Sequence, residues 1–252
     1  MLLPPQPGIT YGPVRSRRLG RSLGINILPA RRKLCNFDCR YCQYGWSDPV
    51  APGLAATRDL PEVDDILEAV ASTLRSLPSP PDYVTFSGNG EPTLHPRFGE
   101  IVDGVNDLRS RLAPRARTAI LSNSSTVGDA GIRAALSRLD VRIMKLDVGT
   151  EAGFQRYNRP AGGLTLDDIA GGLGLLPGIT LQTLLTTGSA GNLNDAEMDA
   201  WIERVAAIQP VSVQLYTLDR ESPDRFLVPA TPEQIAGVQA RVAALGIKAE
   251  VY

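Results

Sequence analysis

The chain has 252 residues, of which 43% are hydrophobic and 21% charged, and its formal net charge at pH 7 is -1. These values are close to the averages of globular proteins and exclude a disordered, collagen-like or low-complexity chain. The N-terminus MLLPPQPGIT lacks the basic and apolar regions of a secretion signal, and no run of about 18 apolar residues occurs. We therefore expect a cytoplasmic protein with no membrane partner.

Positive charge is concentrated in an N-terminal basic segment, residues 1–33. No acidic residue occurs there, and the second half of the segment contains Arg15, Arg17, Arg18, Arg21, Arg31, Arg32 and Lys33. Such a run is typical either of a solvated basic surface or of a site for an anionic partner such as a phosphate or a nucleic acid.

Short β-rich runs alternate with longer helical patterns along most of the chain. Strands are predicted over residues 23–27, 83–86, 118–122, 142–146, 179–185 and 211–216, and a final edge strand over 248–251. Helices are predicted over 63–77, 97–112, 129–139, 166–176, 195–208 and 232–245, with Asp195 as the N-cap of the fifth and Thr231 opening the sixth.

This order of elements predicts an α/β protein with a parallel sheet. No Pro- or Ser-rich linker interrupts it, so residues 1–252 are expected to form a single domain. Six βα units can form either a doubly wound sheet or a curved, incompletely closed barrel. In both, ligands bind at the C-terminal ends of the strands.

Polar residues follow several of the predicted strands. The turn SGNGEPT occupies residues 87–93, SNSST occupies 122–126, and Lys145 and Asp147 alternate at the end of the next strand. Gln182, Gln214 and Tyr216 lie on later strands at positions that period-two alternation directs to one face. We expect these groups to line one cavity, and we predict Gln182, Gln214 and Tyr216 as substrate contacts.

All three cysteines of the chain, Cys35, Cys39 and Cys42, lie in the stretch CNFDCRYC. An odd number of closely spaced thiols indicates a metal or cluster site in a reducing compartment rather than a disulfide framework. A fully ligated ferredoxin cluster needs four cysteines. A zinc site completed by His95, the single histidine, is one alternative; a cubane that leaves one iron open for a small molecule is the other.

The cysteine spacing, with the aromatic residue Tyr41 before the third cysteine, resembles the signature of the radical S-adenosylmethionine superfamily. The glycine- and glutamate-containing turn SGNGEP after the second strand is similar to the corresponding turn of that family. The resemblance implies a partial (β/α)6 barrel with outer helices, and a [4Fe-4S] cluster held by Cys35, Cys39 and Cys42 in the loop of residues 35–44.

The resemblance also implies chemistry and partners. S-adenosylmethionine would bind the open iron and be cleaved reductively to a 5′-deoxyadenosyl radical, which abstracts a substrate hydrogen. A reducing partner such as flavodoxin or ferredoxin would supply the electron. The predicted cofactor contacts are the backbone of Gly88, Asn89, Gly90 and Glu91 for the methionine amino group, Tyr41 near the adenine, and, for the carboxylate or ribose, Ser122, Asn123, Lys145 and Asp147.

Within the superfamily the chain resembles the wyosine-synthase-like group, through YGPVRSRRLGRSLGINILP, SGNGEPTLHP, KLDVGTE and QTLLTTG. The tRNA enzymes of that group have further N-terminal cysteines for a second cluster, which this chain lacks. The substrate therefore stays open between RNA, a glycine of a partner enzyme, and an anionic metabolite with the candidate clamps Arg15, Arg17, Arg18, Arg156 and Arg159. A non-enzymatic role in electron transfer or redox sensing is a further alternative.

Overall fold

The computed structural model describes residues 2–46 and 59–252. One sheet contains eight strands in the order β1-β2-β3-β4-β5-β6-β8-β10, so β1 and β10 form its two edges. Only β1 (Thr10–Ser16) is antiparallel to its neighbour. The parallel strands are β2 (Gly20–Ile25), β3 (Tyr83–Phe86), β4 (Arg117–Ser122), β5 (Val141–Lys145), β6 (Thr180–Leu184), β8 (Ser212–Tyr216) and β10 (Lys248–Val251).

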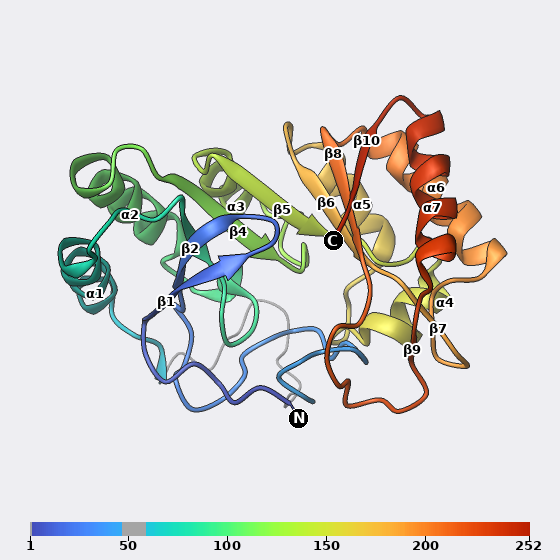
Figure 1. Ribbon diagram of the computed structural model, residues 1–252, viewed down its shortest axis with the longest axis horizontal. Coiled ribbons are helices and arrows are strands. Elements are labelled where there is room, and N and C mark those ends of the chain that lie inside the picture. Colours follow the sequence, from blue (N-terminus) through green and yellow to red (C-terminus); the bar gives the residue numbers. More distant parts are fainter. Residues whose placement is uncertain (1, 47–58) are drawn as a thin grey trace.

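One helix follows each parallel strand except the last, with an additional short segment between β5 and β6, and the helices lie outside the curved sheet (Figure 1). They are α1 (Val63–Ser76), α2 (Phe98–Leu112), α3 (Ala130–Ser137), α5 (Leu166–Gly174), α6 (Asp195–Ile208) and α7 (Pro232–Ala244). The predicted partial barrel of βα units is confirmed: these repeated units place the sheet inside and the helices outside, because each amphipathic helix buries one apolar face on the strands.

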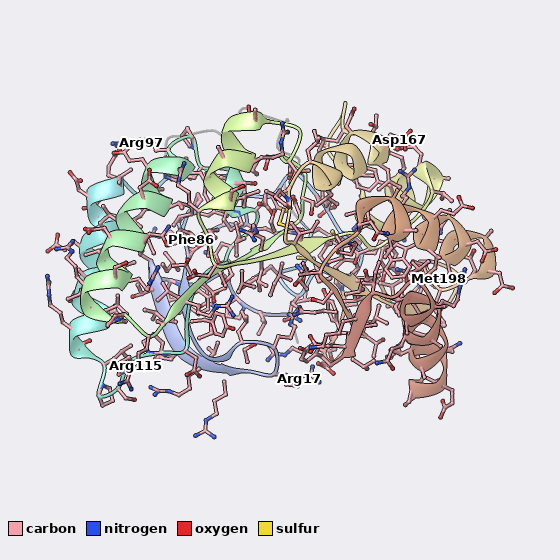
Figure 2. All side chains as sticks on the ribbon, turned by 90° about the horizontal axis from the view of Figure 1, so that it is seen from above. Arg17, Phe86, Arg97, Arg115, Asp167 and Met198 are labelled. Atoms are coloured by element: carbon pink, nitrogen blue, oxygen red, sulfur yellow. The ribbon has the colours of Figure 1, made fainter. Side chains whose placement is uncertain are left out.

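The apolar layer between sheet and helices is well illustrated at β3. Phe86 points toward α2, where its ring meets that of Phe98 edge to face at 5.8 Å between centroids (Figure 2). Both rings are fully buried. Alternate residues of β3 therefore contact different layers: Phe86 faces the helices, whereas Tyr83 and Thr85 face the inside of the curved sheet.

The inner face of the sheet is more polar than the outer face. Ser22 on β2 bonds Thr85 on β3 at 2.7 Å between their hydroxyl oxygens. The turn that joins β1 to β2, residues 16–20, which we call the hairpin turn, extends across this face. There Leu19 is buried against Ala119 of β4 and Ile143 of β5. The chain thus closes part of the barrel interior with its own hairpin turn.

Several elements differ from the sequence-based expectation. β1 is not predicted by the sequence, because Gly12 and Pro13 interrupt its alternation. The N-cap of α6 is Asn194 rather than Asp195, since the Asn194 carboxamide oxygen accepts from the Glu197 backbone N–H at 3.1 Å. Thr231 does open α7, in a capping box with Gln234.

Short elements complete the chain. They are the 3-10 turn η2 (Pro92–Leu94), the single-turn helix α4 (Glu151–Gly153), the π-helical turn η3 (Phe154–Asn158), and a separate two-stranded sheet of β7 (Thr186–Thr187) and β9 (Val228–Pro229). Across residues 2–46 and 59–252, no helix has both the length and the apolar character needed to cross a membrane.

Candidate functional site

The cysteine loop is attached to its surroundings by backbone hydrogen bonds on two sides. On one side Leu34 donates to the Asn89 carbonyl at 2.8 Å and accepts from the Glu91 N–H at 3.0 Å. On the other side Asp38 donates to the Asn158 carbonyl at 3.1 Å, and Arg40 donates to that of Tyr157 at 3.1 Å. The loop is therefore fixed between the ends of β3 and β5.

The three sulfur atoms lie around one cavity of about 180 Å³, which we call the cysteine cavity. Cys35 and Cys39 are buried and Cys42 is half-buried, and all three are free thiols. Within the described part of the chain, no three His, Cys, Asp or Glu side chains are close enough to bind a single metal ion. Thiolates spread around a cavity instead fit a multinuclear iron–sulfur cluster, whose irons are each held by a separate sulfur.

Burial raises the pKa of the Cys35 thiol to about 12 and that of the Cys39 thiol to about 11. Without a bound metal these two thiols stay protonated at neutral pH. Since the thiolate is the metal ligand, iron would have to displace both protons.

Side-chain amides approach two of the sulfurs. The Asn123 amide nitrogen is 3.5 Å from Cys35 Sγ, and the Asn158 amide nitrogen is 3.5 Å from Cys39 Sγ. Hydrogen bonds to ligand sulfurs are among the features that set the reduction potential of a cluster. Asn158 lies in η3, for which the sequence gives no periodic signal.

Lys33 places a positive charge beside the same sulfurs. Its side chain is only 6% exposed, and its ammonium donates to the Gly45 carbonyl at 2.9 Å. Burial alone would lower the pKa of Lys33, but its interactions with the neighbouring sulfurs of Cys42, Cys35 and Cys39 hold it above the ordinary value. Sequence reasoning assigns Lys33 only to the basic segment and misses this position.

The turn after β3 lines the opposite wall of the cysteine cavity with Gly88, Gly90 and Glu91. Gly88 and Gly90 have φ values of 127° and 140°, which L side chains rarely adopt. A Cβ on Gly90 would lie 1.7 Å from the Leu34 carbonyl oxygen. Glycine at this position therefore allows the turn and the cysteine loop to pair.

The side chain of Asn89 points away from the cavity. It is fully buried and bonds the backbone of Gln6 and Pro29, while its own N–H donates to the Asn26 carboxamide at 3.0 Å. The Asn89 carbonyl already accepts from the Leu34 N–H, so the predicted cofactor contact of Asn89 could be made only through the second lone pair of that carbonyl.

Glu91 joins the turn after β3 to the end of β4. Its carboxylate accepts from the Ser122 hydroxyl at 2.9 Å, from the Asn123 N–H at 2.5 Å and from the Thr93 hydroxyl at 2.6 Å. Burial raises the pKa of Glu91, and these donors oppose the effect. The bonds bring Glu91, Ser122 and Asn123 together at the cysteine cavity.

A second buried polar group connects β5 to the cysteine loop. The Asp147 carboxylate accepts from the Tyr41 hydroxyl, from the Asn158 amide at 2.8 Å, from the Leu184 N–H at 2.9 Å and from the Lys145 ammonium at 3.4 Å. Asp147 is thus occupied by protein donors, which suits a role in orienting Tyr41 and Lys145 more than direct contact with a ribose.

Lys145 itself lines the cysteine cavity. Its ammonium bonds the Tyr216 hydroxyl at 2.9 Å and lies 4.9 Å from the centroid of the Tyr41 ring. Burial alone would lower the pKa of Lys145, but the Asp147 carboxylate and Tyr216 raise it above the ordinary value. The group remains a cation available to a bound carboxylate.

The predicted substrate residues separate in the structure. Gln182 lines the cysteine cavity, and Tyr216 lines a neighbouring pocket. Gln214 lies further down β8, in a different cavity of about 460 Å³ toward the N-terminal ends of the strands. Its buried side-chain oxygen has no hydrogen-bond partner among the described residues.

The zinc alternative is not supported by the position of His95. Its Nε2 faces the Pro61 carbonyl at 3.3 Å and its Nδ1 accepts from the Arg97 N–H at 3.1 Å. The residue sits at the entry of α2 and is absent from the lining of the cysteine cavity. A fourth ligand for zinc is therefore not supplied by histidine.

The sequence profile described as the Radical SAM superfamily matches residues 33–206, which is more than half of the chain. The chain belongs to the radical SAM superfamily. It is also 34% identical over 215 residues to a UPF0026 protein of Synechocystis sp., covering 84% of this chain and 76% of that protein. A UPF0026 protein of Helicobacter pylori is 29% identical over 236 residues, covering 90% and 71%.

Solved radical SAM structures share the fold at low identity. A radical SAM methyltransferase from Sphaerobacter thermophilus superposes with a TM-score of 0.61 at 15% identity, covering 92% of this chain and 65% of that one. TYW1 with a lysine-pyruvate adduct gives 0.61 at 14% identity, covering 89% and 73%. SuiB of Streptococcus suis bound to S-adenosylmethionine gives 0.65 at 10% identity, covering 91% and 50%.

This radical SAM chain therefore spans about two thirds of the methyltransferase and half of SuiB. Membership of the superfamily establishes its cofactors as a [4Fe-4S] cluster and S-adenosylmethionine. The three-cysteine cavity fits such a cluster in the chemistry of its donors. A cubane with four cysteine ligands from this chain is excluded, because its sequence contains three cysteines.

Replacing Gly90 by alanine should separate the cysteine loop from the turn after β3. We expect Gly90→Ala to lower the free energy of unfolding by about 1–3 kcal/mol, because the methyl group meets the Leu34 carbonyl and φ is strained. Denaturant unfolding of the cluster-free protein measures this. The matched control is Gly163→Ala, where φ is also positive but no atom lies within 4 Å; equal losses in both would exclude the clash as the cause.

Proposed function

We propose that this radical SAM protein is an enzyme that uses a 5′-deoxyadenosyl radical to abstract hydrogen from an anionic substrate. The observation that carries the proposal is the cysteine cavity. Its walls combine three cysteine sulfurs, the backbone of Gly88 and Gly90, and the Lys145 ammonium. When bound, the cluster and S-adenosylmethionine supply the electron transfer and carbon–sulfur cleavage that no side chain can perform.

In this scheme the residues of the chain bind and orient the cluster and S-adenosylmethionine and protect the radical. Cys35, Cys39 and Cys42 would hold three irons. The backbone of Gly88 to Glu91 would receive the methionine amino group, since glycine permits close approach of a ligand. Lys145 would pair with the methionine carboxylate, and Asp147 would hold Lys145 and Tyr41 in place.

Ser122 and Asn123 are proposed to contribute cofactor contacts from the end of β4, where Glu91 fixes their position. Tyr41 is proposed to lie near the adenine, because its ring forms a wall of the cysteine cavity. Gln182 and Tyr216 are the proposed substrate contacts nearest to this cavity, and Gln214 would contact only a ligand that enters the lower barrel.

The reaction class beyond hydrogen abstraction, whether oxidoreductase or lyase, follows from the substrate. A tRNA-modifying reaction has support from the fold of TYW1, and a glycyl-radical activase from a domain described as a pyruvate-formate lyase-activating enzyme of Bacteroides vulgatus (TM-score 0.50). Copurification of RNA would favour the first and capture of one large enzyme the second.

The proposal also includes a single domain over residues 1–252, a cytoplasmic location and a reductant of the flavodoxin or ferredoxin type.

The primary test is formation of 5′-deoxyadenosine. After anaerobic reconstitution with iron and sulfide and reduction with dithionite, the wild-type protein should convert S-adenosylmethionine to 5′-deoxyadenosine, measured by mass spectrometry. Cys39→Ala should form none, because one iron loses its ligand. An intact wild-type cluster that yields no product and no spectral change with S-adenosylmethionine would reject the proposal and revive the electron-transfer alternative.

Lys145→Gln should weaken binding of S-adenosylmethionine about tenfold or more, since a charge-assisted hydrogen bond to the methionine carboxylate is lost. Calorimetry on the reconstituted protein measures the affinity. The control Lys248→Gln removes an exposed ammonium (69%) on β10 and should leave the affinity unchanged. Equal affinities for wild type and Lys145→Gln would remove Lys145 from the cofactor site.

Lys33→Met should lower the reduction potential of the cluster on the order of 100 mV, because a buried positive charge beside the cluster favours the reduced, more negative state. A redox titration followed by electron paramagnetic resonance measures this independently of turnover. Lys33→Arg keeps the charge and should stay near the wild-type potential. A potential unchanged in Lys33→Met would contradict the electrostatic role.

A further inference from the structure

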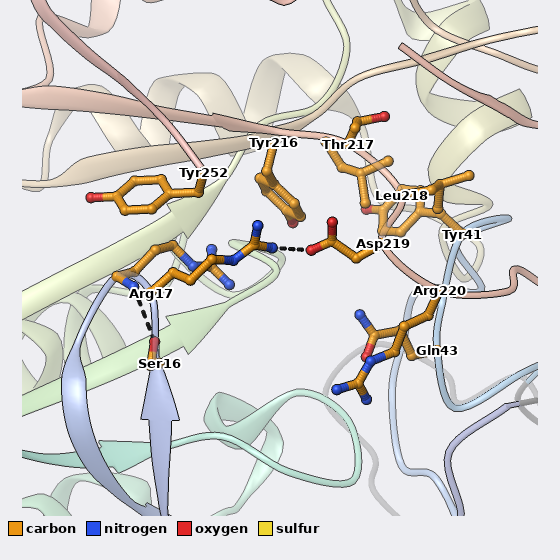
Figure 3. A pocket seen from close by; sticks show the side chains of 12 residues that line it. Ser16, Arg17, Tyr41, Gln43, Tyr216, Thr217, Leu218, Asp219, Arg220 and Tyr252 are labelled. Atoms are coloured by element: carbon orange, nitrogen blue, oxygen red, sulfur yellow. Dashed lines mark hydrogen bonds and ion pairs between the residues drawn. The ribbon is translucent and has the colours of Figure 1, made fainter. Parts of the chain in front are cut away.

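A second pocket of about 210 Å³ lies beside the cysteine cavity, and we call it the arginine pocket. It is lined by residues 16–18 of the hairpin turn, Tyr41 and Gln43 of the cysteine loop, Leu184, residues 216–220 after β8, and Tyr252. Figure 3 shows Arg17 and Asp219 facing each other across it, with Tyr216 and Tyr252 on one side and Arg220 on the other.

The charges of this pocket are unbalanced. Three arginine side chains line it, Arg17, Arg18 and Arg220, against one acidic side chain, that of Asp219. Asp219 is paired with Arg17, and both side chains are exposed. Among residues 2–46 and 59–252, no acidic side chain forms an ion pair with either of the other two guanidinium groups.

Arg18 is the innermost of the three. Its guanidinium donates to the Gln182 side-chain oxygen at 2.9 Å and lies 5.0 Å from the centroid of the Tyr216 ring. No ion pair formed within residues 2–46 and 59–252 includes it. A guanidinium is always charged, and removing it from water without an anionic partner is costly. Neutral contacts leave donors of Arg18 free to bind an oxyanion.

The position of Arg18 results from the fold. The hairpin turn is held in the barrel by Leu19, which is buried against Ala119 and Ile143, and the Ser16 hydroxyl accepts from the backbone N–H of Arg18 at 3.2 Å. Arg18 is therefore presented from a fixed backbone and not from a free terminus. Such preorganisation reduces the entropy lost when a ligand binds.

The arginine pocket adjoins the site of radical formation. Tyr41 lines both the arginine pocket and the cysteine cavity. Tyr216, which packs on Arg18, also bonds the Lys145 ammonium at 2.9 Å. A molecule in the arginine pocket would thus lie against Tyr41, which also lines the cysteine cavity, and against Tyr216, which bonds the Lys145 ammonium of that cavity.

We propose that the arginine pocket binds a phosphate or carboxylate group of a small-molecule substrate, with Arg18 as the principal anchor and Arg220 as a second contact. The inference rests on the proposed function for the statement that the ligand is the substrate. The pocket is smaller than the roughly 300–1,000 Å³ of drug-sized sites, which favours a small oxyanion over a nucleic acid. Arg15, Arg156 and Arg159, the other candidate clamps, do not line it.

The test is calorimetric titration of the reconstituted protein at low salt with inorganic pyrophosphate and, separately, with malonate. Saturable binding of at least one probe is expected, and the probe that binds distinguishes a phosphate from a carboxylate site. Arg18→Gln should weaken it about tenfold or more, as for a lost charge-assisted contact. Arg18→Lys keeps the charge without the planar fork and should recover part of the affinity.

Arg31→Gln is the control, because Arg31 is an exposed residue of the same basic segment and lines none of these cavities. Arg220→Gln should weaken probe binding severalfold. Because Arg220 is exposed, this variant provides a second test if the Arg18 variants fail to fold. Absence of saturable binding of both probes overturns the inference, as does an equal loss in Arg18→Gln and Arg31→Gln. Tighter binding of a single-stranded RNA than of either probe, sensitive to Arg18, also overturns it.

This titration needs neither cleavage of S-adenosylmethionine nor turnover. Probe binding that depends on Arg18 in a protein that forms no 5′-deoxyadenosine would support the anion site and reject the proposed chemistry. Formation of 5′-deoxyadenosine without probe binding would support the chemistry and reject the anion site. The two proposals can therefore fail separately.

Discussion

Backbone pairing between Leu34 and the turn after β3 is the contact on which the site depends. It can form only because Gly90 has no side chain at the point where the Leu34 carbonyl approaches. This pairing holds the cysteine loop beside the end of β3, although the loop itself contains no helix or strand that could fix its position. The thiols, the glycine turn and Glu91 then share one cavity.

Buried carboxylates fix the rest of the cavity in a similar way. Glu91 connects β3 to β4, and Asp147 connects β5 to β6 and to the cysteine loop. Each accepts several protein donors, as a buried carboxylate must if it is not to be strongly destabilising. The parallel sheet brings the strand ends together, and these carboxylates set the spacing between neighbouring loops.

Much of the fold was accessible from the sequence. The parallel strands and outer helices follow from local patterns of apolar residues, and the three cysteines that share the cavity were recognisable from a spacing within eight residues. The turn at Gly88 to Glu91 was recognisable because two closely spaced glycines indicate a tight turn of the backbone. Strand parity indicated that Lys145 and Gln182 point to one face of the sheet, and both side chains line the cysteine cavity.

Contacts made across the fold were not accessible. Asn158 reaches Cys39 and Asp147 only because a π-helical turn directs it there, and Lys33 reaches the thiols only after the loop folds back. Gln214 has the parity of Tyr216 yet lies in a different cavity, because parity fixes the face of a strand and not the depth along it. Asn194 and Asp195 are both good N-cap residues, so the sequence does not show which of the two begins α6, and the structure has Asn194 in that position.

The hairpin turn has a consequence for how related chains can diverge. Its backbone is anchored by Leu19 and by pairing of β1 with β2, and Arg17 and Arg18 project from that anchored frame. The backbone pairing of the sheet and the attachment of the cysteine loop use neither of these two side chains, so we expect residues 17 and 18 to tolerate exchange. The stretch from residue 16 to residue 42 thus contains both the arginines proposed to bind the substrate and the three cysteines proposed to hold the cluster, on two loops with separate anchors.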